Sequence, residues 1–184
     1  MAFNINEIKS QLTFGGAKAS LFQVAITNPI NGVADLKTPF MVQAAQIPEA
    51  TMGVIEIPYF GRKVKVAGDR TFAEWTVTII NDEDFLIRNA MEQWMASINS
   101  HESNTTQLGT SSASEYKAQA QITQYGKTGD ALRTYNFNGL FPTTIGAITM
   151  DWGSNDAIET FEVTFQYDWW NVSGGITGDG GTNE

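Results

Sequence analysis

The chain has 184 residues, of which 42% are hydrophobic and 17% are charged, which predicts one folded domain over residues 1–184 and excludes a disordered chain. It has no cysteine, which excludes disulfides, thiolate metal sites and thiol nucleophiles. The formal net charge of −9 disfavours a protein that grips nucleic acid, because such binding depends on lysine and arginine. No apolar run approaches the roughly 18 residues of a membrane span, so we expect a protein made in the cytoplasm without a membrane anchor.

The sequence opens with an amino-terminal arm, residues 1–20, which contains a pair of glycines. Residues 21–27 (LFQVAIT) and 40–45 then favour extended structure. Between them, residues 28–32 (NPING) are typical of a turn, because proline and glycine preset the backbone angles that a turn needs. The chain is therefore expected to reverse direction early.

Residues 46–66 are expected to form a projecting hairpin, because apolar and polar positions alternate on either side of Pro58 and Gly61. Pro58 has no N–H group for a strand ladder, which places this hairpin at an edge of the main sheet or outside it. The only basic cluster of the chain lies in and just beyond it: Arg62, Lys63, Lys65 and Arg70. Three interpretations stay open for these charges, namely a solvated face, a contact with an acidic patch of another subunit, or an anion site.

Residues 75–81 (WTVTIIN) predict a strand, and the pattern then changes to a helical period over residues 84–99. One apolar stripe follows that period: Leu86, Ile87, Ala90, Met91, Trp94, Met95 and Ile98. Three carboxylates fall at its start: Asp82, Glu83 and Asp84. We expect them to cap the free N–H groups of the first turn rather than to bind a metal ion.

The second half of the chain reads as a polar surface loop, residues 100–114, followed by strands at 116–125, 132–140 and 158–167. A glycine-rich tail, residues 171–184, is expected to be flexible. The whole pattern predicts a mainly β fold, an antiparallel β-sandwich or barrel-like domain with one packed amphipathic α-helix.

Alternation along these elements separates a core from wet faces. The residues expected in the structural core are Trp75, Trp94, Phe161, Val163 and Phe165. The polar positions between buried ones form two sets, Gln119, Gln121 and Thr123 on one strand, and Glu162, Thr164 and Gln166 on another.

Nothing in the sequence predicts catalysis or a cofactor. The single histidine, His101, lies beside Glu102 in the polar loop, where no packing would hold a base in place. The paired glycines at 15–16 and 174–175 do not stand between a strand and a helix with a following Lys-Ser or Lys-Thr, so they are not phosphate loops. We expect no catalytic residue, no metal site and no cofactor.

Two long blocks resemble the tail tube proteins of T-even-like contractile bacteriophages. The first is VAGDRTFAEWTVTIINDEDFLIRNAMEQW, residues 66–94. The second, residues 115–170, contains EYK, ITQYG, GLFPTTIGAITMDW and SNDAIETFEVTFQYDWW in the same order as that family. The segment LFQV at 21–24 resembles the family's first strand. The arm, the NPING turn, the 100–114 loop and the tail depart from the family pattern.

The resemblance implies the tail-tube fold, which is related to the tube proteins of type VI secretion, and a non-enzymatic subunit of the virion. It implies hexameric rings that stack into a tube and conduct double-stranded genomic DNA. The partners it implies are further copies of the chain, the tail sheath protein, the baseplate tube initiator and the tail terminator, with the tape measure protein and DNA transiently in the lumen. Two alternatives remain: the tube of a secretion or injection device that moves proteins, and a carbohydrate-binding β-sandwich, suggested by five tryptophans and five tyrosines.

Within this frame the hairpin offers apolar surface that one domain does not cover. The candidate contacts between successive rings are Met52, Ile55, Ile57, Tyr59, Phe60, Arg62 and Lys63. Either of the two polar sets, on residues 119–123 or on 162–166, is a candidate lining of the lumen.

Overall fold

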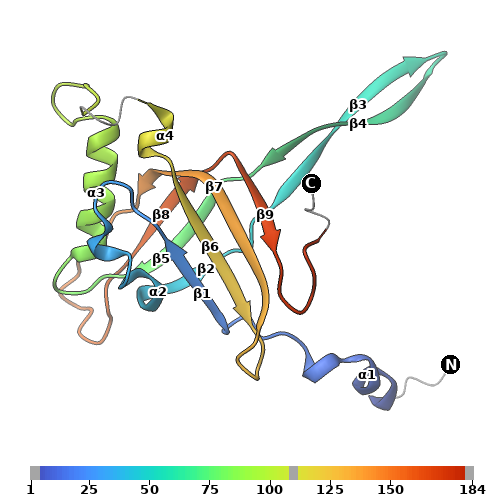
Figure 1. Cartoon of the computed structure of the whole chain (residues 1–184), viewed down its shortest axis with the longest axis horizontal. Coiled ribbons are helices and arrows are strands. Elements are labelled where there is room, and N and C mark those ends of the chain that lie inside the picture. Colours follow the sequence, from blue (N-terminus) through green and yellow to red (C-terminus); the bar gives the residue numbers. More distant parts are fainter. Residues whose placement is uncertain (1–4, 108–111, 181–184) are drawn as a thin grey trace.

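A computed structural model describes residues 5–107 and 112–180 of the chain. Its main element is a seven-stranded antiparallel sheet in the order β1-β6-β7-β8-β5-β2, with β9 paired to β7 (Figure 1). The strands are β1 (Phe22–Ile26), β2 (Val42–Ala45), β5 (Trp75–Ile80), β6 (Ala118–Tyr125), β7 (Ala131–Ile145), β8 (Thr160–Gln166) and β9 (Trp169–Ser173). The end strands β1 and β2 approach each other, so the sheet curves into a barrel-like sandwich. The predicted mainly antiparallel β fold is confirmed.

Strand β7 joins two layers. Its first part pairs with β6 and β9, and its last residues pair with β8. At the junction Gly139 has a φ of +70°, and a Cβ atom there would overlap the carboxylate of Asp168, which binds Lys117 at 2.7 Å. Only glycine fits such a backbone next to such a neighbour. We call β1, β6, the first part of β7 and β9 the front layer, and β2, β5, β8 and the end of β7 the rear layer (Figure 1).

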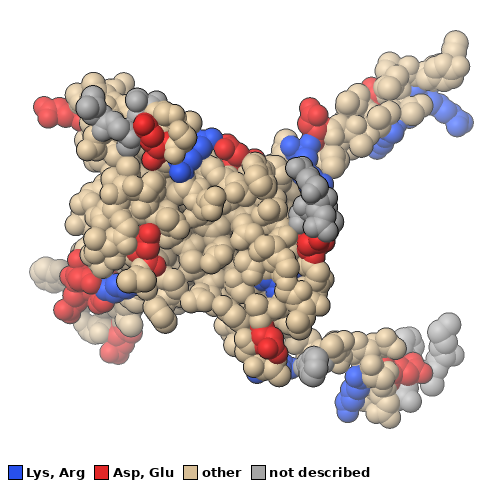
Figure 2. Space-filling model, in the orientation of Figure 1, with Lys and Arg blue, Asp and Glu red and all other residues tan. Residues whose placement is uncertain are grey.

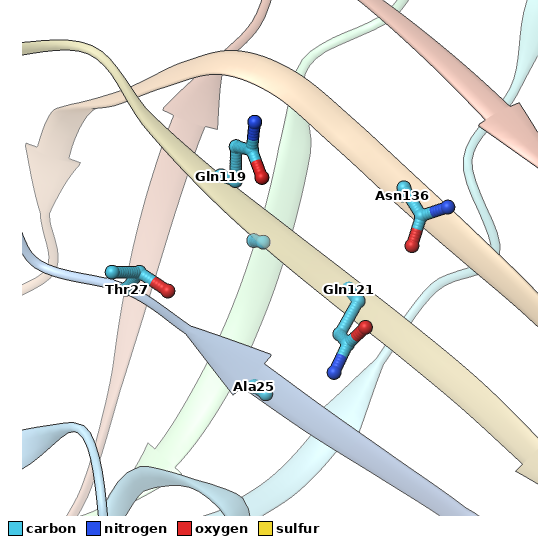
Figure 3. Close-up of a pocket in the computed structure, with 6 residues that line it drawn as sticks. Ala25, Thr27, Gln119, Gln121 and Asn136 are labelled. Carbon is cyan, nitrogen blue, oxygen red and sulfur yellow. The ribbon is translucent and has the colours of Figure 1, made fainter.

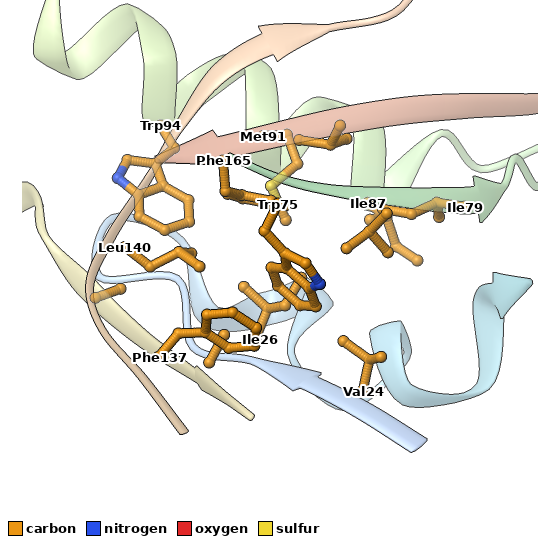
Figure 4. Packing of buried hydrophobic residues seen from close by; sticks show 14 of the residues in the cluster. Val24, Ile26, Trp75, Ile79, Ile87, Met91, Trp94, Phe137, Leu140 and Phe165 are labelled. Carbon is orange, nitrogen blue, oxygen red and sulfur yellow. The ribbon is translucent and has the colours of Figure 1, made fainter. Parts of the chain in front are cut away.

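The hydrophobic core lies between these layers. Trp75 of the rear layer stacks on Phe137 of the front layer, with ring centroids 4.2 Å apart (Figure 4). All five residues expected in the core are at most 2% exposed: Trp75, Trp94, Phe161, Val163 and Phe165. Burial of each large apolar side chain stabilises the fold by about 1.5–3 kcal/mol, so the alternation of strands β5 and β8 fixes which face turns inward.

Helix α3 (Leu86–Ile98) packs its apolar stripe against this core, within the range expected for it. Trp94 on that stripe is fully buried, and its indole N–H donates to the carbonyl of Tyr116 at 2.8 Å. At the start of the helix Asp84 accepts from the N–H of Leu86 at 3.0 Å. Asp84 also binds the ammonium of Lys37.

The carboxylates before α3 therefore bind both a backbone N–H group of the helix and the side chain of Lys37. Lys37 donates to Asp82 at 2.7 Å and to Asp84 at 2.5 Å, and these hydrogen bonds hold the pKa of both carboxyl groups below the usual value for aspartate. The prediction that all three acidic residues cap the helix is correct for Asp84, whereas Asp82 ties the segment before α3 to Lys37. Across the described ranges, no group of three or more metal-ligating residues could hold an ion.

Short helices occupy several connections. They are α1 (Ile5–Gln11), η1 (Thr13–Gly15), η2 (Gly32–Ala34), α2 (Thr38–Met41) and α4 (Ala113–Tyr116). Helix α2 takes the first two residues of the stretch expected to be extended at 40–45, because Pro39 suits the first turn of a helix. Within 5–107 and 112–180, no helix is long and apolar enough to cross a membrane.

Three more predicted segments differ from the structure: the arm, the polar loop and the tail. The arm contains helix α1 and the turn η1, and residues 1–4 lie outside the described ranges. The loop predicted at 100–114 ends in α4, and its residues 108–111 also lie outside. The prediction of a flexible tail from residue 171 is wrong for its first three residues, which belong to β9, where Asn171 accepts from Asn136 at 3.2 Å. Residues 181–184 lie outside as well.

Candidate assembly surfaces

A two-stranded ribbon projects from the domain, formed by β3 (Ala50–Tyr59) and β4 (Arg62–Phe72) (Figure 1). It is longer than the hairpin expected at 46–66, because β4 continues for six residues beyond Val66. Its base is fixed by Phe72, whose ring lies 6.3 Å from that of Trp170 and 6.0 Å from that of Tyr167. The ribbon pairs with neither layer, so Pro58 costs the main sheet no hydrogen bond.

One face of the ribbon is almost entirely apolar. Directly opposed residues share a face, and the register pairs Ile55 with Val66, Ile57 with Val64 and Tyr59 with Arg62. The apolar members of this face are all widely exposed: Ile55 55%, Ile57 50%, Tyr59 65%, Val64 54% and Val66 45%. An isolated two-stranded ribbon is only marginally stable in water, so a partner surface is needed to cover this face.

The opposite face of the ribbon is mixed: Val54 opposes Ala67, Glu56 opposes Lys65 and Pro58 opposes Lys63. Lys63 binds Glu56 at 2.5 Å, with the lysine side chain mostly in solvent. Of the seven predicted contact residues, the structure gathers Ile55, Ile57, Tyr59 and Arg62 on the apolar face and puts Lys63 on the other. Met52 lies beyond a register shift, opposite Arg70, and Phe60 lies in the turn. Two apolar members were missed, although their alternation with Lys65 signals them: Val64 and Val66.

The turn of the ribbon stores backbone strain. Phe60 has a φ of +42° and Gly61 a φ of +80°, the combination of a type I′ turn. Asparagine, aspartate or glycine suits the first of these positions, whereas a bulky residue there costs about 1–2 kcal/mol. The ring of Phe60 is 92% exposed, and its edge-to-face contact with the ring of Tyr59, at a centroid distance of 4.7 Å, offsets only part of that cost. A strained, exposed aromatic residue at the tip of a projecting ribbon indicates a contact outside the subunit.

Charged side chains are sparse over the middle of the front layer's outer face (Figure 2), where Gln119, Gln121 and Asn136 lie (Figure 3). The strand registers place Gln119, Gln121 and Thr123 in one continuous surface with residues of β1, β7 and β9. Those neighbours are Gln23, Ala25, Thr27, Thr134, Asn136, Asn138, Trp169, Asn171 and Ser173. None of these residues is charged. A shallow depression of about 200 Å³ lies among Ala25, Thr27 and the amides of Gln119, Gln121 and Asn136 (Figure 3).

The second predicted polar set lies on the rear layer. Glu162 opposes Thr78, Gln166 opposes Phe141, and the hydroxyls of Thr164 and Thr76 lie 3.3 Å apart. Because the inner faces of the two layers meet in the core, their outer faces point away from each other (Figure 1). The two sets therefore belong to opposite sides of the subunit, and only one of them can line a lumen.

The remaining sequence candidates form no site. His101 and Glu102 lie in an exposed turn after α3, where packing does not hold the imidazole in place as a base. The basic residues Arg62, Lys63, Lys65 and Arg70 are distributed over both faces and the length of the ribbon, so they do not converge on one anion.

This architecture, a β-sandwich with a projecting ribbon and one packed helix, is a fold that also occurs in solved structures of contractile injection systems. It superposes with a TM-score of 0.64 on a chain of the PVC sheath/tube terminator of an extracellular contractile injection system, at 18% identity over 86% of this chain and 97% of that one. A chain of the PVC sheath-tube complex superposes with a TM-score of 0.59, over 94% and 99% of the two chains, also at 18% identity. At such identities the likeness shows the fold.

Sequence similarity identifies the protein family to which the chain belongs. Residues 6–173 match the phage tail tube protein family. The chain is 36% identical over 155 residues to tail tube protein gp19 of Enterobacteria phage T4, which covers 84% of this chain and 90% of that protein. The chain therefore belongs to the phage tail tube proteins, a family of structural components of the virion, and the resemblance seen in the sequence is confirmed. A carbohydrate-binding module is excluded by this assignment.

Proposed function

We propose that copies of this chain form hexameric rings that stack into a tube, and that the outer face of the front layer lines the lumen through which double-stranded DNA leaves the virion during contraction. The uncharged amides and hydroxyls of that face carry the proposal. Affinity for DNA comes mainly from lysine and arginine that displace counterions from phosphates, and this face has neither. A wet surface without cations lets a polyanion pass and does not hold it.

Ring closure would also pair the exposed edge strands of the sheet with those of neighbouring subunits. The front layer ends at β1 on one side and at β9 on the other. Unpaired strand edges promote uncontrolled association, and closure into a continuous barrel removes them. Contacts that join different surfaces of identical subunits close into rings when the rotation allows and otherwise extend as filaments. A ring contact combined with a stacking contact of this kind gives a tube.

The apolar face of the ribbon supplies the stacking contact between successive rings. The side chains of Ile55, Ile57 and Tyr59 gain most by burial, whereas Arg62 adds an exposed ion pair of small value. Assembly takes place in the host cytoplasm, on the baseplate initiator and around the tape measure protein, and ends at the tail terminator inside the sheath. The solved relatives described as a sheath-tube complex and a sheath/tube terminator support sheath and terminator as partners.

Electron microscopy of the purified full-length chain tests the proposal. We expect hollow tubes of uniform width, or six-fold rings at low concentration, in negative stain. Light scattering should show large species that grow with protein concentration. A strictly monomeric protein at high concentration, without rings or tubes, would overturn the proposed function.

The Phe60→Asn substitution separates backbone strain from contact at the ribbon tip. Asparagine tolerates positive φ, so the turn of the isolated subunit should be relaxed. Assembly should nevertheless weaken, because the exposed ring is lost, and we expect the critical concentration for tube formation to rise about five- to tenfold. Light scattering over a dilution series measures it, with Phe60→Tyr as the control that keeps both ring and strain. A critical concentration at or below that of the unchanged protein would show that Phe60 makes no assembly contact.

A further inference from the structure

We propose that a second surface of this chain, an exposed ridge formed by Val33, Leu36 and Phe40, receives the apolar face of the ribbon from another copy. The inference rests on the proposed function, since it names the receptor of the stacking contact. The ridge lies on the segment from η2 to α2, beside β1 and α3.

The three ridge residues share one side of a helical segment. Its turns are closed by hydrogen bonds from the N–H of Asp35 to the carbonyl of Gly32 (3.2 Å) and from the N–H of Phe40 to that of Lys37 (3.1 Å). Spacings of three and four residues stack side chains on one helical face. That face is in solvent, with Val33 65%, Leu36 85% and Phe40 80% exposed. The other side of the segment is anchored in the fold through Ala34 and Thr38, each 1% exposed.

The ridge is held rigidly. The hydroxyl of Thr38 donates to the carbonyl of Ala34 at 2.9 Å, and the carboxylate of Asp35 accepts from the N–H of Asn28 at 3.2 Å. Lys37, which lies between the ridge residues in sequence, is tied to Asp82 and Asp84. A preorganised apolar surface loses little conformational entropy when a partner covers it, so it is suited to binding.

The charges around the two surfaces are complementary. The ridge borders the segment with Asp82, Glu83 and Asp84, of which Lys37 neutralises only part. The ribbon carries four basic residues, Arg62, Lys63, Lys65 and Arg70, against two acidic ones, Glu56 and Asp69. Figure 2 shows basic side chains along the ribbon at the upper right and acidic ones gathered at the lower left. Such rims steer partners and set register, while the apolar contact supplies the affinity.

The positions of the two surfaces favour a contact between copies. The ribbon leaves the domain on the β9 side, where Phe72 packs on Trp170, and the ridge lies at the far side of the front layer, against β1 (Figure 1). One chain cannot bring its own ribbon and ridge together. A head-to-tail contact of this kind joins two different surfaces, so it repeats from copy to copy and extends an assembly.

A competing apolar surface lies at the same end of the molecule. The loop 147–159 exposes Met150 (74%), Trp152 (101%) and Ile158 (74%), and it is fixed near the start of α3 by the amide of Asn81, which donates to Glu159 at 2.9 Å. Trp152 lies in a turn and Met150 and Ile158 lie in irregular backbone, so the three form no regular face that would match the ribbon. Trp152 therefore provides a neighbouring control position.

Cysteine cross-linking tests whether the ribbon docks on the ridge. The chain has no cysteine of its own, so only the introduced cysteines can react. One set of variants places cysteine at Val33, Leu36 or Phe40, and a second set, with a different affinity tag, at Ile55, Ile57 or Tyr59. Each pair is co-assembled into tubes and treated with a short bismaleimide. We expect covalent dimers that carry both tags. Ribbon cysteines paired with Trp152→Cys should give none. Absence of a cross-linked product from every pair of ribbon and ridge cysteines would overturn the proposal, whether or not Trp152→Cys gives a product.

The double variant Leu36→Ser/Phe40→Ser gives an independent measure. Both side chains are exposed, so the subunit should keep its fold by circular dichroism, while the fraction of protein in sedimentable tubes should fall about tenfold. Trp152→Ser is the matched control and should assemble normally. Normal tubes from the ridge variant, together with failure of the ribbon variants, would exclude the ridge and leave the proposed function standing. Absence of tubes from the unchanged protein would instead refute the proposed function itself.

Discussion

Subunits carrying Ile55→Asp and Tyr59→Ser together are expected to fold normally and to fail to elongate into tubes. Both side chains lie on the exposed apolar face of the ribbon, away from the core, so their loss should leave the domain intact. At a ring-to-ring contact each would be buried, and removal of a large apolar side chain costs about 1.5–3 kcal/mol, with a further cost for burying an unpaired carboxylate. The loss recurs at every subunit of a ring, so elongation should stop.

Sedimentation and electron microscopy measure this effect. Arg62→Ala should cause a milder defect that varies with salt, because an exposed ion pair is weak and screened. Lys63→Ala is the matched control on the opposite face of the same ribbon and should assemble like the unchanged protein. Long, normal tubes from the Ile55/Tyr59 variant would contradict the assignment of the apolar face to stacking.

Phage whose tube carries Gln121→Lys are expected to eject DNA about tenfold more slowly at low salt. Gln121 lies in the middle of the uncharged face, between Ala25 and Asn136. Under the proposed geometry the substitution adds a ring of ammonium groups to every layer of the tube, and each group can release counterions from a passing phosphate. The delay should shrink as salt is raised, because that release then gains less.

Real-time ejection from purified virions provides the measurement, with tail length checked by microscopy so that assembly defects are not mistaken for slow passage. Thr164→Lys is the matched control, since Thr164 occupies the equivalent polar position on the opposite side of the subunit. We expect no delay from it. Slow ejection from Thr164→Lys with normal ejection from Gln121→Lys would assign the lining to the rear layer instead.

Much of the fold can be predicted from the alternation of apolar and polar residues along the sequence. The segments where that prediction fails are explained by tertiary packing. The alternation in β5 and β8 and the helical stripe around Trp94 predict the core, because burial decides the orientation of those elements. Strand β7 extends to Ile145, beyond the range predicted, although Pro142 reads as a strand breaker. Pro142 is buried where β7 crosses between layers, opposite Phe165, and only tertiary packing reveals that such a position tolerates proline.

The ribbon and the ridge could be predicted only in part from the sequence. The ribbon is visible in the sequence, but the residues that share a face depend on register, and register depends on the turn. Phe60-Gly61 does not resemble a common type I′ pair, because phenylalanine is disfavoured at positive φ. With that turn assigned, the pairing of Tyr59 with Arg62 follows, and Val64 and Val66 join the apolar face. The ridge at Val33, Leu36 and Phe40 was hidden because residues 40–45 read as extended.

The ribbon has a joint partway along its length. Between Met52 and Val54 the register shifts, and Gly53 and Gly68 pass so closely that a Cβ on either would lie 3.2 Å from backbone atoms of the opposite strand. A pair of residues without side chains at a bulge offers little resistance to bending and twisting. In a stack of rings joined by such ribbons, the tip of each ribbon would stay docked on its neighbour while the base of the ribbon rotates slightly with its own subunit. A long, thin tube built this way can flex under a sideways load without separating its rings.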